Sequence, residues 1–461
     1  VENYLLGMDC GTTNIKAVII GEDGTVAAEA SRPNCFICPG PGMQEQDAGR
    51  WWENSVEIFR ALCEEAGMEV VRRIRGIGIS SHTVTMLPVD KDGVPLRNAL
   101  TYQDTRSGGE LDCIVDTIGW ERFVNMVGGR PGAGFLPSKI LWFKKNEPEL
   151  FARTSSFMQA SSYINFKLTG KRTIDIDQAA RTQCLDISTM DWASEIGDVI
   201  GVDLDSVMPP LKLVNEIIGF VTDEAADATG LVSGIPVIAG CSDAMASMYA
   251  MGMSRLGEAG ESSGTSSLVF VGSDVKSAPD FPVVTKPCAI TGMPWVFDAP
   301  ITTTGLALNW YIETMAAEER AAAKEQGKDI YTYLNELALE ADPGSGGLLF
   351  YPYLMGERAP IWKDYARSMF IGMSISTTRA EMARSVFEGT AFALRHVIET
   401  IGKAGAGAGM LRITGGGAKS RTWSRIKAAV LDMPVYVLDE RSGNVPVGDA
   451  LIAGHKLGVF P

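Results

Sequence analysis

The opening thirty residues constrain the fold more than any other feature, because they alternate apolar runs with tight turns. Residues 4–8, 15–20 and 26–30 are apolar, and the segments Asp9-Cys-Gly-Thr-Thr-Asn14 and Glu22-Asp-Gly24 separate them. Such runs, bounded by Gly, Asn and Asp, predict strands joined by hairpins. The chain is therefore expected to begin with an antiparallel meander. A dinucleotide-binding unit would instead pass from its first strand through a glycine loop into a helix.

Length and charge limit the class of protein and its partners. The 461 residues are too many for one hydrophobic core and suit two or three domains. The net charge of −15 argues against nucleic acid as a partner, since a phosphate backbone requires a basic surface. A mononucleotide remains compatible with this charge, because backbone amides and one magnesium ion can hold it.

The sequence indicates neither a membrane protein nor a secreted one. No apolar run reaches the roughly 18 residues that a membrane span needs. Val1 to Asp9 lack a basic cluster and a long apolar run, so a secretory signal is not expected. Cys35 and Cys38 form a C-x-x-C pair without a second pair or a nearby histidine, which favours coincidence over a zinc or redox site. Reduced thiols in a cytoplasmic protein fit this cysteine usage best.

The rest of the chain mixes helical and strand patterns. Apolar spacing predicts helices over 48–66, much of 138–170, the residues after Asp243, 377–401 and the segment around Trp423. Strands are expected at 74–80, 234–239, 267–271 and 411–414. Thr378-Arg-Ala-Glu381 matches a capping box at the start of the clearest helix.

The opening pattern recurs in weaker form in the second half of the chain. A turn-rich run covers 257–266, and an apolar strand follows at 267–271. The separation is far too long for a solenoid repeat. It favours two related domains, 1–247 and 248–461, each contributing a hairpin to a shared cleft, although two unrelated hairpins would give the same pattern.

The first turn combines a carboxylate with glycine and hydroxyls, in Asp9-Cys-Gly-Thr-Thr13. Glycine lets a backbone approach phosphate oxygens closely. Threonine hydroxyls and turn amides can donate to phosphate, and Asp9 can order the water shell of magnesium. The alternative is an ordinary hairpin turn stabilised by the aspartate side chain.

Two further turns suit a nucleotide. Ser262-Ser-Gly-Thr-Ser-Ser267 is a candidate second phosphate turn, and a polar surface turn is its alternative. Gly415-Gly-Gly-Ala-Lys-Ser420 joins a strand to a helix, but Ala418 stands where a P-loop requires glycine before the lysine. We interpret it as a flat surface for adenosine, with close packing of a helix on a sheet as the alternative.

Asp243 lies where a predicted strand meets a predicted helix. It could be the general base that accepts the proton of an attacking hydroxyl, since phosphoryl transfer requires one such carboxylate besides positioning and magnesium. Taken alone, the position favours the alternative of a helix N-cap, worth about 1 kcal/mol.

Two polar segments could meet a polyhydroxylated ligand. Tyr102-Gln-Asp-Thr-Arg106 carries amide, carboxylate and guanidinium groups, and a solvated loop is its alternative. His82 follows a predicted strand, where a structural histidine is the alternative. A Ser-His-Asp hydrolase is disfavoured, because no Gly-x-Ser-x-Gly elbow lies between a strand and a helix.

These motifs occur in an order that resembles the FGGY carbohydrate kinases across nearly the whole chain. Leu354-Met-Gly-Glu-Arg-Ala-Pro-Ile-Trp362, Thr304-Gly-Leu-Ala-Leu-Asn-Trp310 and Thr414-Gly-Gly-Gly-Ala-Lys-Ser420 look like signatures of its C-terminal domain. Within the family, the sequence looks most like the branch of xylulokinases and related ketose or polyol kinases. The resemblance implies an α/β fold with two actin-like domains, of the ribonuclease H-like and hexokinase type, around a central cleft.

The resemblance also implies an activity and roles for matching positions. The protein would transfer the γ-phosphate of ATP to a hydroxyl of a small sugar or polyol, with Asp243 as the base and Asp9 serving Mg²⁺. Nucleotide would be bound by Gly11, Thr12, Thr13, Lys16, Gly264, Thr265, Gly305, Asn309, Gly415, Gly416 and Ser420. Substrate would be bound by His82, Thr83, Val84, Asp104, Arg106 and Asp243. A homodimer is common in the family.

Two departures accompany the resemblance. Xylulokinases carry a Gln-Met-His-Gly run where this chain reads His82-Thr-Val-Thr85, which argues against D-xylulose itself as the substrate. The chain also stops sooner after Gly454 than most relatives. A non-catalytic ATP-binding sensor or chaperone-type module is the alternative function, and sugar-stimulated ADP release would distinguish the two. A dehydrogenase is disfavoured, because no Gly-x-Gly-x-x-Gly follows the first strand.

Overall fold

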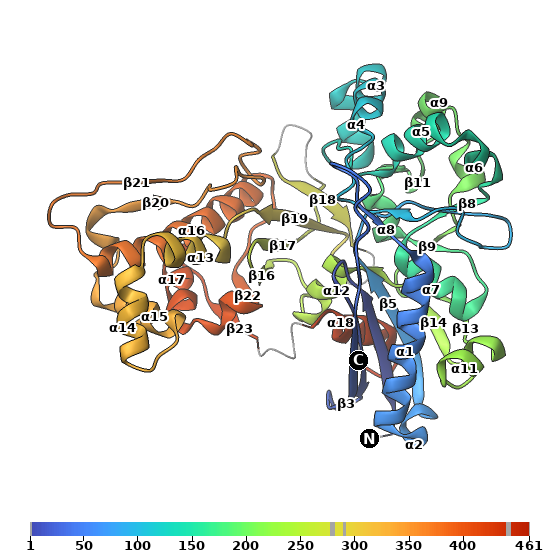
Figure 1. Cartoon of the computed structure of the whole chain (residues 1–461), viewed down its shortest axis with the longest axis horizontal. Helices are drawn as coiled ribbons and strands as arrows, with labels where there is room; N and C mark the ends of the chain where they lie inside the picture. The colour runs from blue at the N-terminus through green and yellow to red at the C-terminus, as the bar shows by residue number, and fades with distance from the viewer. Residues whose placement is uncertain (1, 277–281, 289–291, 439–443, 461) are drawn as a thin grey trace. The chain divides into compact units, whose positions relative to one another are not determined.

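The computed structural model describes residues 2–276, 282–288, 292–438 and 444–460. The chain forms two compact units (Figure 1). Unit 1 contains Val1–Ala250, Lys286–Ile290 and Asn444–Pro461, and unit 2 contains Met251–Thr285 and Thr291–Gly443. This division differs from the predicted 1–247 and 248–461 mainly at the end of the chain. The last helix belongs to unit 1, because it packs on strands of the first sheet.

The meander predicted for the start of the chain is confirmed. Its three strands pair antiparallel, and they are β1 (Tyr4–Cys10), β2 (Asn14–Gly21) and β3 (Val26–Pro33). The strand β5 (Ile74–Ser81) then pairs parallel with β1. The sheet order is β13-β14-β5-β1-β2-β3, with β15 also on β5, and the added strands are β13 (Ile217–Phe220), β14 (Pro236–Ile238) and β15 (Cys241–Ser242).

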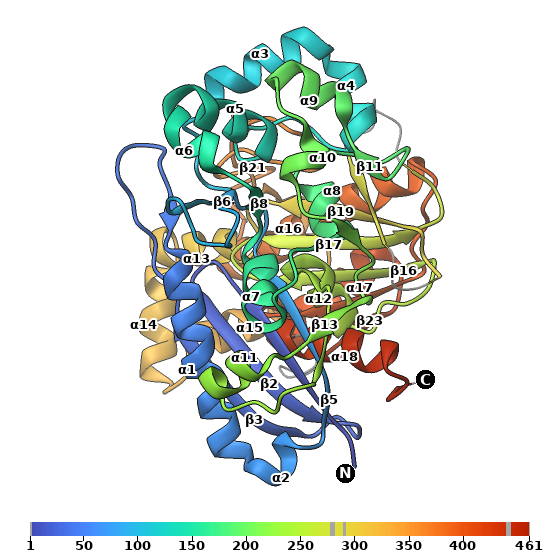
Figure 2. The same ribbon diagram turned by 90° about the vertical axis from the view of Figure 1, so that its right-hand side faces the viewer.

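Helices cover both faces of this sheet (Figure 2). Because side chains alternate along a strand, Leu6 and Met8 of β1 join the core under α1 (Ala48–Ala66), which packs on β2 and β3. On the other face, α18 (Val445–Lys456) packs on β1 and β5. Gly7 permits this close approach, since a Cβ there would lie 1.8 Å from the carbonyl oxygen of Pro446.

A largely helical region is inserted between β5 and β13. Its helices are α3 (Gly108–Ile118), α4 (Trp120–Val127), α5 (Leu136–Asn146), α6 (Pro148–Arg153), α7 (Ala160–Thr169), α8 (Ile176–Arg181), α9 (Ser194–Ile200) and α10 (Leu204–Val207). The other helices of unit 1 are α2 (Met68–Val71), α11 (Asp223–Thr229) and α12 (Asp243–Ala250). Four two-stranded pairs complete the unit, formed by β4 (Glu45–Gln46) with β7 (Ala99–Leu100), β6 (Leu87–Val89) with β8 (Ser156–Met158), β9 (Ile174–Asp175) with β12 (Leu211–Lys212), and β10 (Leu185–Asp186) with β11 (Asp191–Trp192).

Unit 2 has a sheet of the order β18-β19-β17-β16-β22-β23. Its strands are β16 (Glu258–Ser263), β17 (Ser267–Ser273), β18 (Val284–Pro287), β19 (Trp295–Ile301), β22 (Met410–Thr414) and β23 (Val435–Val437). The strands β16, β17 and β19 form an antiparallel meander, and β22 pairs parallel with β16. This order repeats that of β1, β2, β3 and β5. The two units therefore share one topology, as the recurrence in the sequence suggested.

The helices of unit 2 gather around α16 (Arg379–Lys403), which begins at the predicted capping box of Thr378 and Glu381. The others are α13 (Gly305–Thr314), α14 (Ala317–Glu325), α15 (Ile330–Glu340) and α17 (Arg421–Leu431), with short 3₁₀ turns at Ser345–Gly347 and Gly416–Lys419. A two-stranded sheet, β20 (Leu349–Tyr351) with β21 (Met369–Ile371), packs on α16. In the part of the chain that the structure covers, no helix is both long and apolar enough to cross a membrane.

One local prediction was wrong, and a second is confirmed with one interruption. Most of the run 257–266 is the strand β16, and the turn is confined to the residues before Ser267. Its glutamate, Glu261, is buried and ion-paired with Lys427 at 2.6 Å, a long-range contact that overrides the polar pattern. The helical prediction over 138–170 is interrupted by β8, which pairs with β6.

Candidate active site

Asp9 is the last residue but one of β1 and is buried. It is opposite Lys16 on β2 and opposite Ser80 on β5. Burial and the nearby Asp243 carboxylate raise the pKa of Asp9 to about 8, although Lys16 and the Ser80 hydroxyl act in the opposite direction. The Asp243 carboxylate is therefore near enough to Asp9 to affect its ionisation.

The turn after Asp9 is braced from within unit 1. The side-chain amide of Asn34 donates to the carbonyl of Gly11 at 2.8 Å, and that of Gln46 donates to the carbonyl of Thr12 at 2.9 Å. Thr13 and Lys16 are exposed. The four residues of this hairpin that are predicted to contact phosphate therefore lie on or just after a turn of fixed conformation. The side chains of the last two are exposed.

Asp243 is the first residue of α12, directly after the short strand β15. The cap of this helix is Ser242, whose hydroxyl accepts from the amide of Met245 at 3.2 Å. Asp243 accepts from the amide of Ala244 at 2.7 Å and is half-buried. The N-cap alternative for Asp243 is thus met by its neighbour, and the Asp243 carboxylate need not perform that structural role.

Asp177 of α8 fixes the residue before Asp243. Its carboxylate accepts from the amide of Ser242 at 2.9 Å and from the Ser242 hydroxyl at 2.5 Å, and it pairs with Arg181 at 2.8 Å. Asp177 is fully buried. The junction that carries Asp243 is therefore held in one conformation. The sequence analysis missed Asp177, and only its position in a polar run before Arg181 could have suggested it.

His82 is buried beside the end of β1. Its Nδ1 lies 2.8 Å from the carbonyl oxygen of Cys10, which can only accept, so Nδ1 carries the proton. Burial lowers the pKa of His82 to about 4, with a smaller contribution from the charge of Lys139, while the hydrogen bond to Cys10 acts in the opposite direction. The imidazole is therefore neutral at physiological pH, and its Nε2 is an acceptor.

Several buried polar atoms near this segment lack partners among the described residues. They are Nε2 of His82, Oγ1 of Thr83 and of Thr85, Nε2 of Gln159 and Oε1 of Gln178. Gln159 accepts from the amide of Thr85 at 2.8 Å, and Gln178 donates to the hydroxyl of Ser81 at 3.0 Å, so both belong to the same neighbourhood. Buried polar atoms are rarely left unpaired, which favours a polar ligand here. Val84 is buried and offers no polar side-chain atom.

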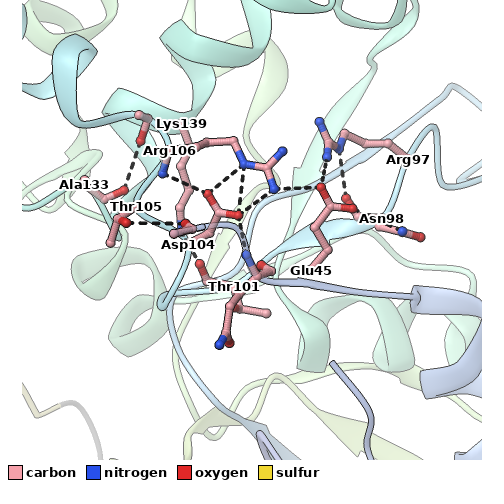
Figure 3. A network of polar contacts seen from close by, with 12 residues as sticks. Glu45, Arg97, Asn98, Thr101, Asp104, Thr105, Arg106, Ala133 and Lys139 are labelled. Atoms are coloured by element: carbon pink, nitrogen blue, oxygen red, sulfur yellow. Dashed lines mark hydrogen bonds and ion pairs between the residues drawn. The ribbon is translucent and has the colours of Figure 1, made fainter. Parts of the chain in front are cut away.

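Asp104 and Arg106 form a buried ionic network rather than an open polar surface (Figure 3). Arg106 donates to both carboxylate oxygens of Asp104, and its Nη2 also reaches Glu45 at 2.8 Å. The backbone amide of Gln44 also donates to Oδ2 of Asp104 at 2.7 Å. These bonds occupy both oxygens of Asp104. The geometry therefore points to a bracing role for this pair, and their predicted contact with substrate stays a prediction.

Lys139 lies in the same network and is fully buried. Its ammonium donates to the carbonyls of Thr101 and Gly134, at 2.5 and 2.6 Å. Burial lowers the pKa of Lys139 to about 7, although the Asp104 carboxylate opposes this shift. The network of Figure 3 thus fixes the loop from Thr101 to Arg106 against α5.

Unit 2 contains a pocket of about 650 Å³ between α13, α15 and α17. Six of the predicted nucleotide-binding residues line it, namely Gly264, Thr265, Gly305, Asn309, Gly416 and Ser420. Residues 150 apart in sequence therefore meet in one place. The sequence analysis missed the remaining lining, which is Leu308, Asp329, Tyr331, Thr332, Asn335, Gly417, Lys419 and Trp423. Asp329 caps α15 through the amides of Tyr331 and Thr332.

Glycines shape this pocket. A Cβ on Gly305 would lie 2.5 Å from the carbonyl oxygen of Gly264, so α13 can begin against the hairpin turn only at a glycine. A Cβ on Gly416 would meet no atom within 4 Å, so this residue borders open space. Gly415 is absent from the lining and contacts the hairpin instead, since a Cβ there would lie 2.6 Å from the carbonyl oxygen of Ser263. A helix N-terminus beside a glycine turn suits an anionic group.

The duplicated sheet topology and the glycine-lined pocket define an α/β protein of the actin-like ATPase type. Residues 4–250 match the N-terminal domain of the FGGY family of carbohydrate kinases, and residues 261–457 match its C-terminal domain. The chain belongs to the FGGY family of carbohydrate kinases. It is an ATP-dependent sugar kinase, a phosphotransferase with an alcohol group as acceptor.

Relatives of two named activities match over nearly the full length. The chain is 29% identical to a xylulose kinase of Bacillus subtilis, over 99% of this chain and 89% of the relative. It is also 29% identical to a gluconokinase of the same organism, over 94% of this chain and 84% of the relative. The crystal structure of a xylulose kinase from Rhodospirillum rubrum superposes with a TM-score of 0.89 at 29% identity, covering 98% of this chain and 89% of that one.

Proposed function

We propose that Asp243 is the general base of the kinase reaction. The observation that supports this proposal lies at the start of α12, where Ser242 caps the helix and Asp177 fixes Ser242. The backbone at Asp243 is thereby held in place, and the carboxylate accepts from the amide of Ala244. It also influences Asp9 strongly enough to raise the pKa of that carboxyl, which supports their closeness.

We further propose that Asp9 serves Mg²⁺. Asp9 is a buried carboxyl beside a second one, and both features raise its pKa. A bound cation would stabilise the ionised form of such a group. No group of three or more His, Cys, Asp or Glu suited to a metal occurs within the described ranges. Mg²⁺ does not require one, because it is commonly held by one or two carboxylates, waters and substrate phosphates. When bound, the ion neutralises charge on the phosphates.

The proposed reaction is a direct displacement at phosphorus. A substrate hydroxyl gives its proton to Asp243, and its oxygen forms a bond to the γ-phosphorus of ATP. The bond from that phosphorus to the bridging oxygen breaks, and ADP leaves. The pocket lined by Gly264, Gly305 and Gly416 would hold the nucleotide. The hairpin turn from Gly11 to Thr13 would contact its phosphates.

We propose that the substrate is a small ketose, polyol or aldonate other than D-xylulose. Named xylulose kinases and gluconokinases among the relatives support this class. The unpaired atoms of His82, Thr83 and Thr85 support a ligand with several hydroxyl groups in this place. A site built from buried hydrogen-bonding groups rejects analogues that leave those groups unpaired. The Thr and Val side chains here present different donors and shapes from those of a Gln-Met-His-Gly run.

A coupled assay of ADP release against a panel of ketoses, polyols and aldonates tests this proposal. We expect D-xylulose to be a poor substrate. The fourfold variant His82→Gln, Thr83→Met, Val84→His, Thr85→Gly should move the ranking toward D-xylulose and leave the ATP KM nearly unchanged. The proposal fails if the unaltered enzyme prefers D-xylulose, or if the fourfold variant keeps the original ranking.

We also propose that the protein forms a homodimer in the cytoplasm. The outer face of the β20–β21 sheet supports the dimer, because Leu349 faces Ile371 and Tyr351 faces Met369 across the strands, and all four are exposed. Large exposed apolar patches mark interaction sites. The free thiols of Cys35 and Cys38, both exposed, suit a reducing compartment.

A further inference from the structure

Asp449 is a buried carboxyl that none of the roles above uses. It lies in the middle of α18 and is 1% exposed. Its Oδ2 accepts from the hydroxyl of Ser80 at 2.7 Å, and its Oδ1 is 4.0 Å from the Cys241 sulfur. Burial raises the pKa of Asp449 well above its usual range, the Ser80 hydrogen bond opposes this, and Asp9 and Asp243 raise it further. Burying such a group is costly, and an apolar side chain would fill the same volume at lower cost.

Ser80 connects Asp449 to the proposed active site. It is fully buried in β5, where it is opposite Asp9 on β1 and opposite Cys241 on β15. Its hydroxyl oxygen is 2.7 Å from Asp449 and 3.5 Å from the Oδ1 of Asp9. A hydroxyl has one proton and a rotatable bond, so the shorter contact sets its orientation. The position of the Ser80 oxygen beside Asp9 therefore depends on Asp449.

The backbone around Asp449 is fixed as well. Its own carbonyl oxygen lies over Gly78, where a Cβ would be 2.2 Å away. The preceding Gly448 lies against α12, where a Cβ would be 1.9 Å from the carbonyl oxygen of Ala246. Close backbone contacts at these two glycines therefore fix the position of α18. The Asp449 carboxyl reaches the sheet at the level of Asp9. Both the backbone and the side chain of Asp449 are thus held in one defined position beside Ser80.

We propose that Asp449 is a positioning residue for the kinase reaction, which holds the Ser80 side chain in place and thereby fixes the Asp9 carboxyl that lies against the Ser80 oxygen. This inference rests on the proposed role of Asp9. It assigns a function to the last helix of the chain, which is distant in sequence from the other site residues. Misplacement of a catalytic group by about 1 Å can cost about 100-fold in rate.

Four variants test the inference in the full-length enzyme: Asp449→Asn, Asp449→Leu, Ser80→Ala and the double variant Ser80→Ala/Asp449→Leu. Asparagine retains an oxygen that can accept from Ser80, so we expect a kcat within about threefold of the unaltered enzyme. Asp449→Leu and Ser80→Ala should each lower kcat about tenfold or more, with the sugar KM changed less than threefold. Because both act through one hydroxyl, the double variant should be no slower than the slower single variant.

A binding measurement provides a readout that does not depend on turnover. ATP affinity is measured by calorimetry without sugar, with and without Mg²⁺. We expect Ser80→Ala and Asp449→Leu to lose part of the tightening that Mg²⁺ produces, while the affinity without Mg²⁺ stays the same. Ser55→Ala is the matched control, since Ser55 is a fully buried serine of the same unit that donates to the Trp51 carbonyl. It should leave kcat and the Mg²⁺ effect unchanged.

Several outcomes would overturn the inference. Multiplicative effects of Ser80→Ala and Asp449→Leu would show that the two residues act separately. An Asp449→Asn variant as slow as Asp449→Leu would exclude the acceptor role. If Asp449→Leu does not fold, Ser80→Ala decides, and an unaltered kcat and Mg²⁺ effect in Ser80→Ala would refute the link to Asp9. Asp9→Asn distinguishes failure of this inference from failure of the proposed role of Asp9, because full activity of that variant would refute both.

Discussion

At the scale of single residues, burial decides which polar groups can take part in chemistry. Asp104 and Arg106 pair with each other, and Arg106 also pairs with Glu45, whereas Nε2 of His82 has no partner in the described part of the chain. Asp243 is intermediate between these cases, because neighbouring residues fix its backbone and its side chain is half-buried. The sequence could identify these residue types as candidates. It could not show which were already paired, because pairing depends on contacts between distant segments.

Protonation of His82 provides a prediction at this scale. An unfolded histidine binds a proton as the pH falls through about 6.5, but in the folded protein His82 stays neutral until about pH 4. The unfolded state therefore binds more protons in this window, and stability is lost as the pH falls from 6.5 toward 4. The loss from this residue should reach about 3 kcal/mol at the lower end.

Thermal unfolding at a series of pH values checks this prediction. The Tm of His82→Gln should fall less between pH 6.5 and 4.5 than the Tm of the unaltered enzyme. His396→Gln, which changes an exposed histidine, should follow the unaltered enzyme. Parallel curves for all three proteins would show that His82 does not titrate in the expected range.

At the scale of elements, glycines determine where helices and hairpins can meet. Gly305 lets α13 begin against the turn at Gly264, and Gly7 lets α18 lie on β1. The opening meander was predictable because turn chemistry is local. The strand β16 was not, since its Glu261 depends on Lys427, more than 150 residues away. Asp449 gave no signal for the same reason, because one aspartate in a helical pattern looks like a solvated residue.

The pocket of unit 2 provides a prediction for Gly416→Val. A branched side chain there would project into open space within the pocket. We expect the ATP KM to rise about tenfold, the equivalent of about 1.4 kcal/mol, and the sugar KM to change much less. Steady-state kinetics with each substrate varied in turn measures both. Gly407→Val is the control, as Gly407 is exposed in unit 2, a Cβ there meets no atom within 4 Å, and it lies outside the pocket lining. An equal rise in both constants for Gly416→Val would contradict the nucleotide assignment.

At the scale of the whole molecule, one topology occurs twice, and the chain returns to the first unit at its end. The sequence suggested the duplication through its two hairpins, but α18 was not expected to pack with the first strands. The structure also reveals an apolar sheet face that the sequence did not indicate. On β20 and β21 the alternate residues Phe350 and Phe370 contact each other at 4.6 Å between ring centroids, which leaves Leu349, Ile371 and Met369 outward.

This outer face predicts the effect of charge on assembly. Ile371→Asp places a carboxylate among Leu349, Met369 and Tyr351, so a dimer that buries this face should dissociate. Light scattering after gel filtration should show a dimer for the unaltered enzyme and a monomer for the variant. Val94→Asp, which changes an exposed residue of unit 1, should remain dimeric. A monomeric unaltered enzyme, or a dimeric Ile371→Asp variant, would exclude the proposed interface.

The central claim is that Asp243 performs the proton transfer of a sugar kinase, and one measurement tests it most directly. Sugar-dependent ADP release by Asp243→Ala is compared with that of the unaltered enzyme, and ATP affinity is measured for both. Loss of a general base should lower kcat by about 10²–10⁴-fold, while the ATP affinity stays within about threefold, since Asp243 is not part of the nucleotide pocket. An Asp243→Ala enzyme that turns over within a few-fold of the unaltered one would contradict the account.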